Sequence, residues 1–201
     1  VDDDVVTFVS FVLAEGLVGE CDGACQLMIS QSRRGGLLDD VLDTARARFD
    51  VGVIDKEGPD YVLGQSAFAL FVSEWLGVDR GRGREVRFPD WVLNAPAGLK
   101  RTVVSTFLSL EAEVRSNEGR VVQANEMEIE QLNALLLSFG ILPSRRSTTK
   151  EATNTESPTA RSYYELSVRG KPNLERLLSV FEIRHQNVER LRAHADGGTS
   201  G

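Results

Sequence analysis

Apolar and polar residues follow one another in blocks that predict helices and strands in a regular order. A dense apolar series from Val5 to Leu13 predicts a buried helix, which Glu15 and Gly16 follow directly. The remaining elements of this block are expected as a strand over 25–32, a helix over 36–49, a strand ending near 65 and a helix over 67–78. Helices and strands mixed in this way predict an α+β fold.

The same order of elements returns in the second part of the sequence. The elements expected there are a helix over 101–114, a strand over 119–126, a helix over 127–141, a strand over 163–170 and a helix over 173–183. Two copies of the order αββαββα indicate an internal duplication. We expect a first repeat with its connecting segment over residues 1–99, a second repeat over 100–194 and a tail over 195–201.

An acid stands at the end of the first predicted helix, where a helix disfavours negative charge. Gly16 is a typical helix terminator, so the dipole disfavours Glu15 by about 0.3–1 kcal/mol unless a cation compensates. Glu113 lies 98 residues later and is predicted to hold the equivalent position. If the two apolar helices pack side by side, both carboxylates emerge at one end and can bind divalent cations. If the two predicted sheets form a saddle whose concave face accepts a polyanion, metal ions bound by these carboxylates favour phosphodiester hydrolysis as the function.

The composition predicts a folded protein without a membrane span. The 201 residues are 41% hydrophobic, and no apolar run approaches the ~18 residues that a membrane helix needs. The first residues lack the basic start of a signal peptide, so we expect a cytoplasmic protein. Cys21 and Cys25 have no histidine cluster near them, which favours ordinary thiols over a zinc site. Trp75 and Trp91 are expected in the core.

The charge of the chain argues against a uniformly basic surface. The formal net charge is −7, and of the 23 basic residues four are lysine and 19 are arginine, which resembles the proteins of salt-loving archaea. Basic residues are concentrated in two polar stretches. Each stretch either contacts DNA phosphates or is a solvent-exposed loop without a role in binding. The candidates are Arg80, Arg82 and Arg84 in the first, and Arg145, Arg146, Lys150 and Arg161 in the second.

Four stretches together resemble one known family. They are FVLAEGLV at 11–18, REVRFPDWVLNAPAGLKRTVVSTFL at 84–108, STFLSLEAEV at 105–114 and YYELSVRGKPNLERLLSVFEI at 163–183. The first and third are similar to the two signatures of the LAGLIDADG homing endonucleases of the dodecapeptide (DOD) type, as found in archaeal inteins. The second resembles the segment that leads into the second signature, and the fourth resembles the closing strand and helix. The resemblance covers roughly residues 5 to 192.

The resemblance implies a monomer of two pseudo-symmetric αββαββα repeats whose saddle-shaped sheet surface binds double-stranded DNA and cleaves it with Mg²⁺. By motif position, Glu15 and Glu113 would be the catalytic, metal-binding acids. Basic residues near the scissile phosphates would be Arg87 and Lys171, with Arg169 beside the latter as a further DNA contact. No membrane partner is implied.

The second signature departs from the family pattern. Val114 stands where a glycine is expected after the acid, and a β-branched residue does not readily adopt a left-handed helix cap. Ser109 occupies a position that is usually large and apolar, and Glu111 is a competing acid. A catalytically inactive DNA-binding protein, maturase-like or regulatory, is therefore the alternative to an endonuclease.

Overall fold

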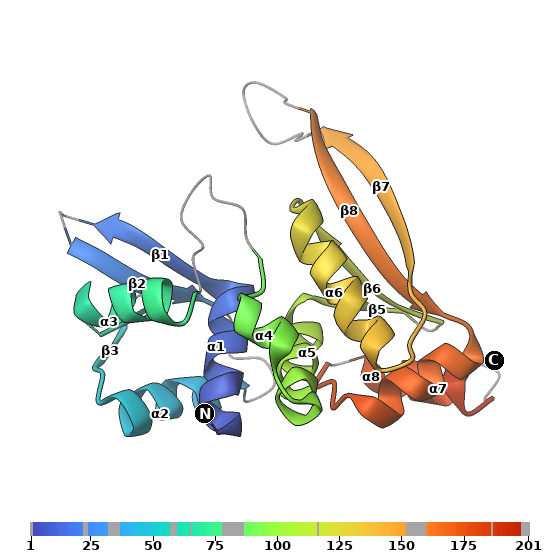
Figure 1. Cartoon of the computed structure of the whole chain (residues 1–201), viewed down its shortest axis with the longest axis horizontal. Coiled ribbons are helices and arrows are strands. Elements are labelled where there is room, and N and C mark those ends of the chain that lie inside the picture. The colour runs from blue at the N-terminus through green and yellow to red at the C-terminus, as the bar shows by residue number, and fades with distance from the viewer. Residues whose placement is uncertain are drawn as a thin grey trace. The chain divides into compact units, whose positions relative to one another are not determined.

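The fold is α+β, as the sequence predicts, and it divides into two compact units, Val1–Leu110 and Glu111–Gly201 (Figure 1). This computed structural model describes residues 2–21, 24–31, 37–56, 60–64, 66–77, 87–115, 117–151, 160–185 and 187–197. Each unit is described by itself below. Among the described residues, no helix has the length and hydropathy needed to cross a membrane.

The first unit contains a four-stranded antiparallel sheet in the order β1-β2-β4-β3, here called the first sheet. Its elements are α1 (Asp3–Glu15), β1 (Gly16–Cys21), β2 (Ala24–Ser30), α2 (Leu37–Phe49), β3 (Val53–Asp55), β4 (Asp60–Leu63), α3 (Ser66–Leu70), the π-helix η1 (Phe71–Trp75), α4 (Asp90–Asn94) and α5 (Ala97–Glu111). Only the last residue of α5 belongs to the second unit.

The second unit repeats this topology in a sheet of order β5-β6-β8-β7, here called the second sheet. Its elements are β5 (Glu113–Val114), β6 (Glu118–Gln123), α6 (Glu126–Ser138), β7 (Ser144–Glu151), β8 (Ala160–Arg169), α7 (Lys171–Val180) and α8 (Val188–Ala195). Strand by strand, β1-β2-β4-β3 corresponds to β5-β6-β8-β7, so the predicted duplication is confirmed in the connectivity of the two sheets.

The helix α1 forms because its sequence is capped at the start and apolar all round. The side chain of Asp2 accepts a hydrogen bond from the Val5 amide at 3.1 Å, and two acids in the first turn complement the helix dipole. Every residue from Phe8 to Ala14 is buried. A helix that is apolar on all sides is buried in the interior of the protein. The packing around α1 therefore fixes the position of its last residue, Glu15.

Gly16 ends α1 by lack of space rather than by an unusual backbone. Its φ of −84° and ψ of 153° are extended values that any residue adopts, so the left-handed cap expected from the sequence is not present. A Cβ at this position would lie 2.5 Å from both the carbonyl oxygen and Cγ1 of Val12. The absent side chain is what allows the chain to leave the helix directly into β1.

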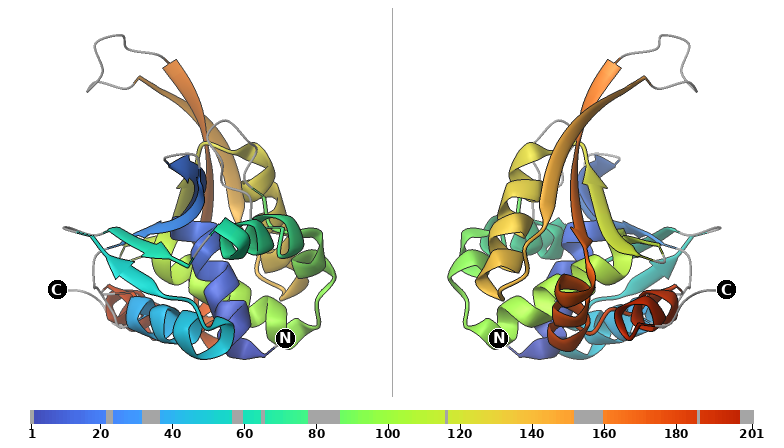
Figure 2. Two further views of the ribbon diagram at one scale, coloured as in Figure 1. Left: turned by 90° about the vertical axis from the view of Figure 1, so that its left-hand side faces the viewer. Right: turned by 90° about the vertical axis from the view of Figure 1, so that its right-hand side faces the viewer.

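Each sheet packs one face against helices of its own unit. In the second unit, Val121, Leu166 and Val168 are buried on the side where α6 and α7 contact the sheet, and a Cβ on Gly119 would lie 3.6 Å from Leu177 Cδ2. Beyond β6, the strands β7 and β8 continue as a two-stranded ribbon (Figure 2).

The structure differs from the sequence-based expectations at two tryptophans and at one helix end. Trp75 is 81% exposed at the end of η1 rather than in the core. Trp91 is half-buried, and its Nε1 donates to the Leu76 carbonyl oxygen at 3.0 Å. The second signature helix, expected to run to Val114, ends at Glu111 because the chain turns into β5.

Candidate functional site

The same pair of side chains occurs at the end of the first helix of both repeats. Glu15 is the last residue of α1, and its Oε1 accepts a hydrogen bond of 2.9 Å from Nε2 of Gln31, which directly follows β2. Glu111 is the last residue of α5, and its Oε2 accepts one of 2.6 Å from Nε2 of Gln123, the last residue of β6. Since β2 and β6 are equivalent strands, the two glutamate–glutamine pairs are equivalent as well.

The acid that corresponds to Glu15 is therefore Glu111 and not Glu113. Glu113 lies in β5, where its half-exposed carboxylate forms ion pairs with Arg115 and Arg120. Hydrogen bonds from Arg120 and Arg115 hold the pKa of Glu113 below its ordinary value. A signal for the correct alignment is present in the sequence, because Phe11 and Phe107 each stand four residues before the helix-end acid.

Aligning Glu111 with Glu15 also changes which residues of the two repeats correspond after the acid. Ala112 takes the place of Gly16, and Val114 takes the place of Val18. Val114 and Val18 are both buried and point to the helix side of their sheets. The valine is therefore an ordinary core residue of β5, and it does not replace a cap glycine.

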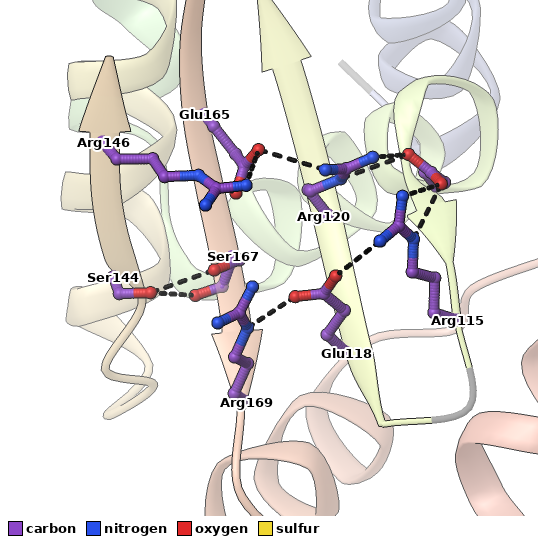
Figure 3. A network of polar contacts seen from close by, with 9 residues as sticks. Arg115, Glu118, Arg120, Ser144, Arg146, Glu165, Ser167 and Arg169 are labelled. Atoms are coloured by element: carbon purple, nitrogen blue, oxygen red, sulfur yellow. Dashed lines mark hydrogen bonds and ion pairs between the residues drawn. The ribbon is translucent and has the colours of Figure 1, made fainter. Parts of the chain in front are cut away.

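The face of the second sheet opposite α6 and α7, here called the polar face, carries a continuous set of ion pairs (Figure 3). Alternation along the strands places these side chains together, because residues two apart share a face. We call the set the arginine–glutamate network, and its order of contacts is Arg146, Glu165, Arg120, Glu113, Arg115, Glu118 and Arg169.

Two buried glutamates hold the outer arginines of this network. Arg146 Nε lies 2.7 Å from Glu165 Oε1, and its Nη2 donates to Oε2 at 2.9 Å. Arg120 Nη1 donates to the same Oε2 at 3.2 Å. On the other side, Arg169 Nε donates to Glu118 Oε2 at 2.5 Å. Burial raises the pKa of Glu165, but the hydrogen bonds and charges of Arg146 and Arg120 outweigh it and leave this pKa below the ordinary value.

The corresponding face of the first sheet has an apolar row in place of part of the arginine–glutamate network. Strand pairing aligns Leu17, Met28, Val62 and Ile54 in one row, where the second sheet has Glu113, Arg120, Ser167 and Ser144. Ile54 is 61% exposed, whereas Val62 is buried. Duplication has therefore kept the topology while the two sheets diverged in chemistry.

The structure separates two neighbouring arginines that the sequence grouped. Arg146 lies on the polar face, but Arg145 points to the helix side, where it pairs with Glu126 at 2.9 Å and Glu130 at 2.7 Å. The hydrogen bond to Glu130 raises the pKa of Arg145. Of these two neighbouring arginines, only Arg146 shares a face with Arg169.

The other predicted basic residues lie in different places. Lys171 begins α7, with its Nζ 3.8 Å from Glu175 Oε1, and Arg87 is exposed just before the buried Phe88. Lys150 and Arg161 are paired residues of β7 and β8. Arg80, Arg82 and Arg84 lie outside the described residues.

The helix-end acids Glu15 and Glu111 suit a hard cation that keeps most of its bound water molecules. No group of three or more His, Cys, Asp or Glu side chains able to hold a metal occurs within the described part of the chain. Mg²⁺ is commonly bound by one or two carboxylates, with waters and substrate phosphates completing its shell. A single fixed carboxylate at each helix end fits this mode of binding, and it does not fit a closed structural site such as that of zinc.

Comparison with known proteins identifies the fold. No family model and no curated protein sequence matches the chain. Solved structures match over nearly its whole length, and their common fold is that of LAGLIDADG proteins.

The matches include two structures of the homing endonuclease I-DmoI. The one of its mesophilic variants has a TM-score of 0.57 at 8% identity, covering 89% of this chain and 94% of that one. I-DmoI in complex with DNA and Ca has a TM-score of 0.56 at 9% identity, covering 89% and 88%. Full-length DUF199/WhiA from Thermatoga maritima has a TM-score of 0.56 at 11% identity, covering 99% of this chain and 62% of that one. At such low identities the likeness establishes the fold alone.

Proposed function

We propose that this protein binds double-stranded DNA and cleaves it with divalent metal ions, for which the helix-end acids Glu15 and Glu111 are each a ligand. The observation that carries the proposal is the duplicated hydrogen bond from Gln31 to Glu15 and from Gln123 to Glu111. Both units contain this pair, although the neighbouring row of side chains is apolar in the first sheet and polar or charged in the second. Retention of one polar pair in two different surroundings favours a chemical role over a packing role.

The glutamines fix the orientation of the carboxylates. Each donates an amide N–H to one carboxylate oxygen, which leaves the second oxygen of that acid facing in a defined direction. The C-terminal end of a helix carries partial negative charge, so a cation is favoured beside these carboxylates. Mg²⁺ at such a site supplies activation of water and stabilisation of the leaving oxygen. I-DmoI, whose fold this chain shares, has been solved with DNA and Ca.

The polar face supplies a surface for the DNA. Arg146, Arg115 and Arg169 are each about half-exposed there. The ribbon of β7 and β8 extends this face, and a two-stranded ribbon fits the major groove. In this proposal the protein acts as a monomer, and the internal duplication takes the place of a symmetric dimer.

The test compares three charge-neutralising variants on one substrate. A duplex that the protein selects from a random pool is placed in a supercoiled plasmid, and cleavage is measured with Mg²⁺. We expect Glu15→Gln and Glu111→Gln each to lower the cleavage rate by at least about 100-fold while binding in EDTA persists. Glu113→Gln should retain cleavage within about 10-fold, because Glu113 is not at a helix end. The exposed Glu189→Gln is the control for an equal change of charge.

The opposite pattern would contradict the assignment of the second acid. If Glu111→Gln cleaves the plasmid at the wild-type rate and Glu113→Gln does not cleave it, Glu113 is the second metal-binding acid.

A second candidate is a DNA-binding protein that does not cut. It is favoured by the likeness to WhiA, which extends over 99% of this chain. Under this candidate the wild type binds duplex DNA, and plasmid remains uncut with Mg²⁺, Mn²⁺ and Ca²⁺ alike. Cleavage in any of these metals rejects it.

A further inference from the structure

We propose that the glutamates of the arginine–glutamate network set the DNA specificity of the polar face: they restrain its arginines from non-specific phosphate binding and hold them for contact with guanine. The inference rests on the DNA-binding part of the proposed function. It assigns a role to Glu113, Glu118 and Glu165 that is separate from cleavage.

The first argument is the charge of the network. Four arginines and three glutamates alternate along it, so the seven residues of the network have a net charge of only +1. Each arginine is within ion-pair distance of at least one carboxylate. A phosphate that approaches one of these arginines must compete with a carboxylate that is already bound, and it meets the repulsion of the half-exposed Glu113. Non-specific binding depends on such phosphate contacts, so the glutamates weaken it.

The second argument is the geometry of the outer arginines. Glu165 engages Nε and Nη2 of Arg146, and Glu118 engages Nε of Arg169. Both glutamates are buried in the sheet, and they therefore hold the Nε side of each guanidinium group in place. An arginine has five N–H donors, so each keeps donors directed away from its glutamate. The guanidinium edge of arginine matches the O6 and N7 acceptors of guanine, and these carry no net charge that a carboxylate would repel.

Arg120 serves a different purpose within the network. It is 16% exposed, and its guanidinium bridges Glu113 on β5 and Glu165 on β8. The hydrogen bond to Glu113 raises its pKa further, so its charge is permanent. Arg120 therefore links the two glutamates across the sheet, while Arg146, Arg115 and Arg169 are the members directed to DNA.

The experiment measures affinity and salt dependence in EDTA, where cleavage does not interfere. Wild type, Glu113→Gln and Glu118→Gln are titrated with the selected duplex and with a non-specific duplex over a salt series, and folding is followed by circular dichroism. Glu189→Gln is the matched control, since it removes one exposed acid from α8 and leaves the polar face intact. All four proteins are used as the full chain.

We expect the two network variants to bind non-specific DNA several-fold more tightly than Glu189→Gln does. The slope of log K against log[salt] should steepen by about 0.9 for each arginine released to a phosphate. The ratio of specific to non-specific affinity should fall by about 5- to 150-fold, which corresponds to the loss of one oriented arginine–guanine contact. Structural damage alone would weaken both affinities, so tighter non-specific binding identifies the proposed role.

Two results overturn the inference in different ways. If Glu113→Gln and Glu118→Gln change the slope and the ratio no more than Glu189→Gln does, the glutamates have no such role, although DNA binding stands. If the folded wild type binds no duplex at any salt, the proposed function fails and the inference fails with it. Because Glu118 is buried, Glu118→Gln can lose its fold; the half-exposed Glu113 then decides the outcome alone.

Discussion

The junction between α1 and β1 offers a sharp test of how the first helix-end acid is held in place. A Cβ on residue 16 would lie 2.5 Å from the carbonyl oxygen and Cγ1 of Val12, whereas ordinary contacts of a Cβ begin near 3.4 Å. Gly16→Ala therefore forces a displacement of roughly 1 Å at the end of a buried helix. The neighbouring atom is backbone, so a side-chain rotation cannot relieve all of the clash.

The magnitude follows from two opposing effects. Overpacking of this kind costs about 1–3 kcal/mol of unfolding free energy. Replacing glycine by alanine also restricts the unfolded chain, which offsets about 0.4–1 kcal/mol. The midpoints of these ranges, about 2 and about 0.7 kcal/mol, leave a net loss of about 1–2 kcal/mol. For a chain of this length, that loss lowers the melting temperature by roughly 2–8 °C.

The assay is thermal unfolding followed by circular dichroism, with Gly19→Ala as the control. Gly19 lies in the same strand, and a Cβ there would meet nothing within 4 Å. Gly19→Ala should melt at or slightly above the wild-type temperature. If Gly16→Ala melts as high as Gly19→Ala, the steric account of the helix end is refuted. Cleavage by Gly16→Ala should also fall, because Glu15 directly precedes the displaced residue.

Two further predictions concern the second unit. Arg146→Ala should weaken binding of the selected duplex by about 5- to 150-fold, whereas Arg145→Ala should not change it, because only Arg146 lies on the polar face; equal losses in the two titrations would contradict this division. The pKa values of Glu113 and Glu165 are lowered on folding, so the unfolded state binds more protons and stability falls as the pH drops through the folded pKa values. Chemical unfolding at pH 7 and at a pH below 4.5, the ordinary pKa of glutamate, should show a smaller loss of stability in acid for Glu113→Gln than for the wild type. Equal losses would remove Glu113 from this linkage.

The sequence by itself was sufficient to determine the α+β fold and its duplication. Apolar periodicity is a local property, because it reports which face of a helix or strand is buried. The dense apolar stretch before Glu15 is found as the buried helix α1, and the acid is its last residue. The order of elements then repeats, and the two sheets have the same strand order.

Only the tertiary structure decided which charged residues lie together. The sequence predicted Glu113 as the second acid, but the end of α5 depends on how β5 pairs with β6, and this makes Glu111 the equivalent of Glu15. Glu118 and Arg169 are far apart in sequence and become partners through the register of β6 and β8. Pairing of this kind is non-local. Each strand residue changes face with a shift of one position, so the contacts follow from the fold and not from the local pattern.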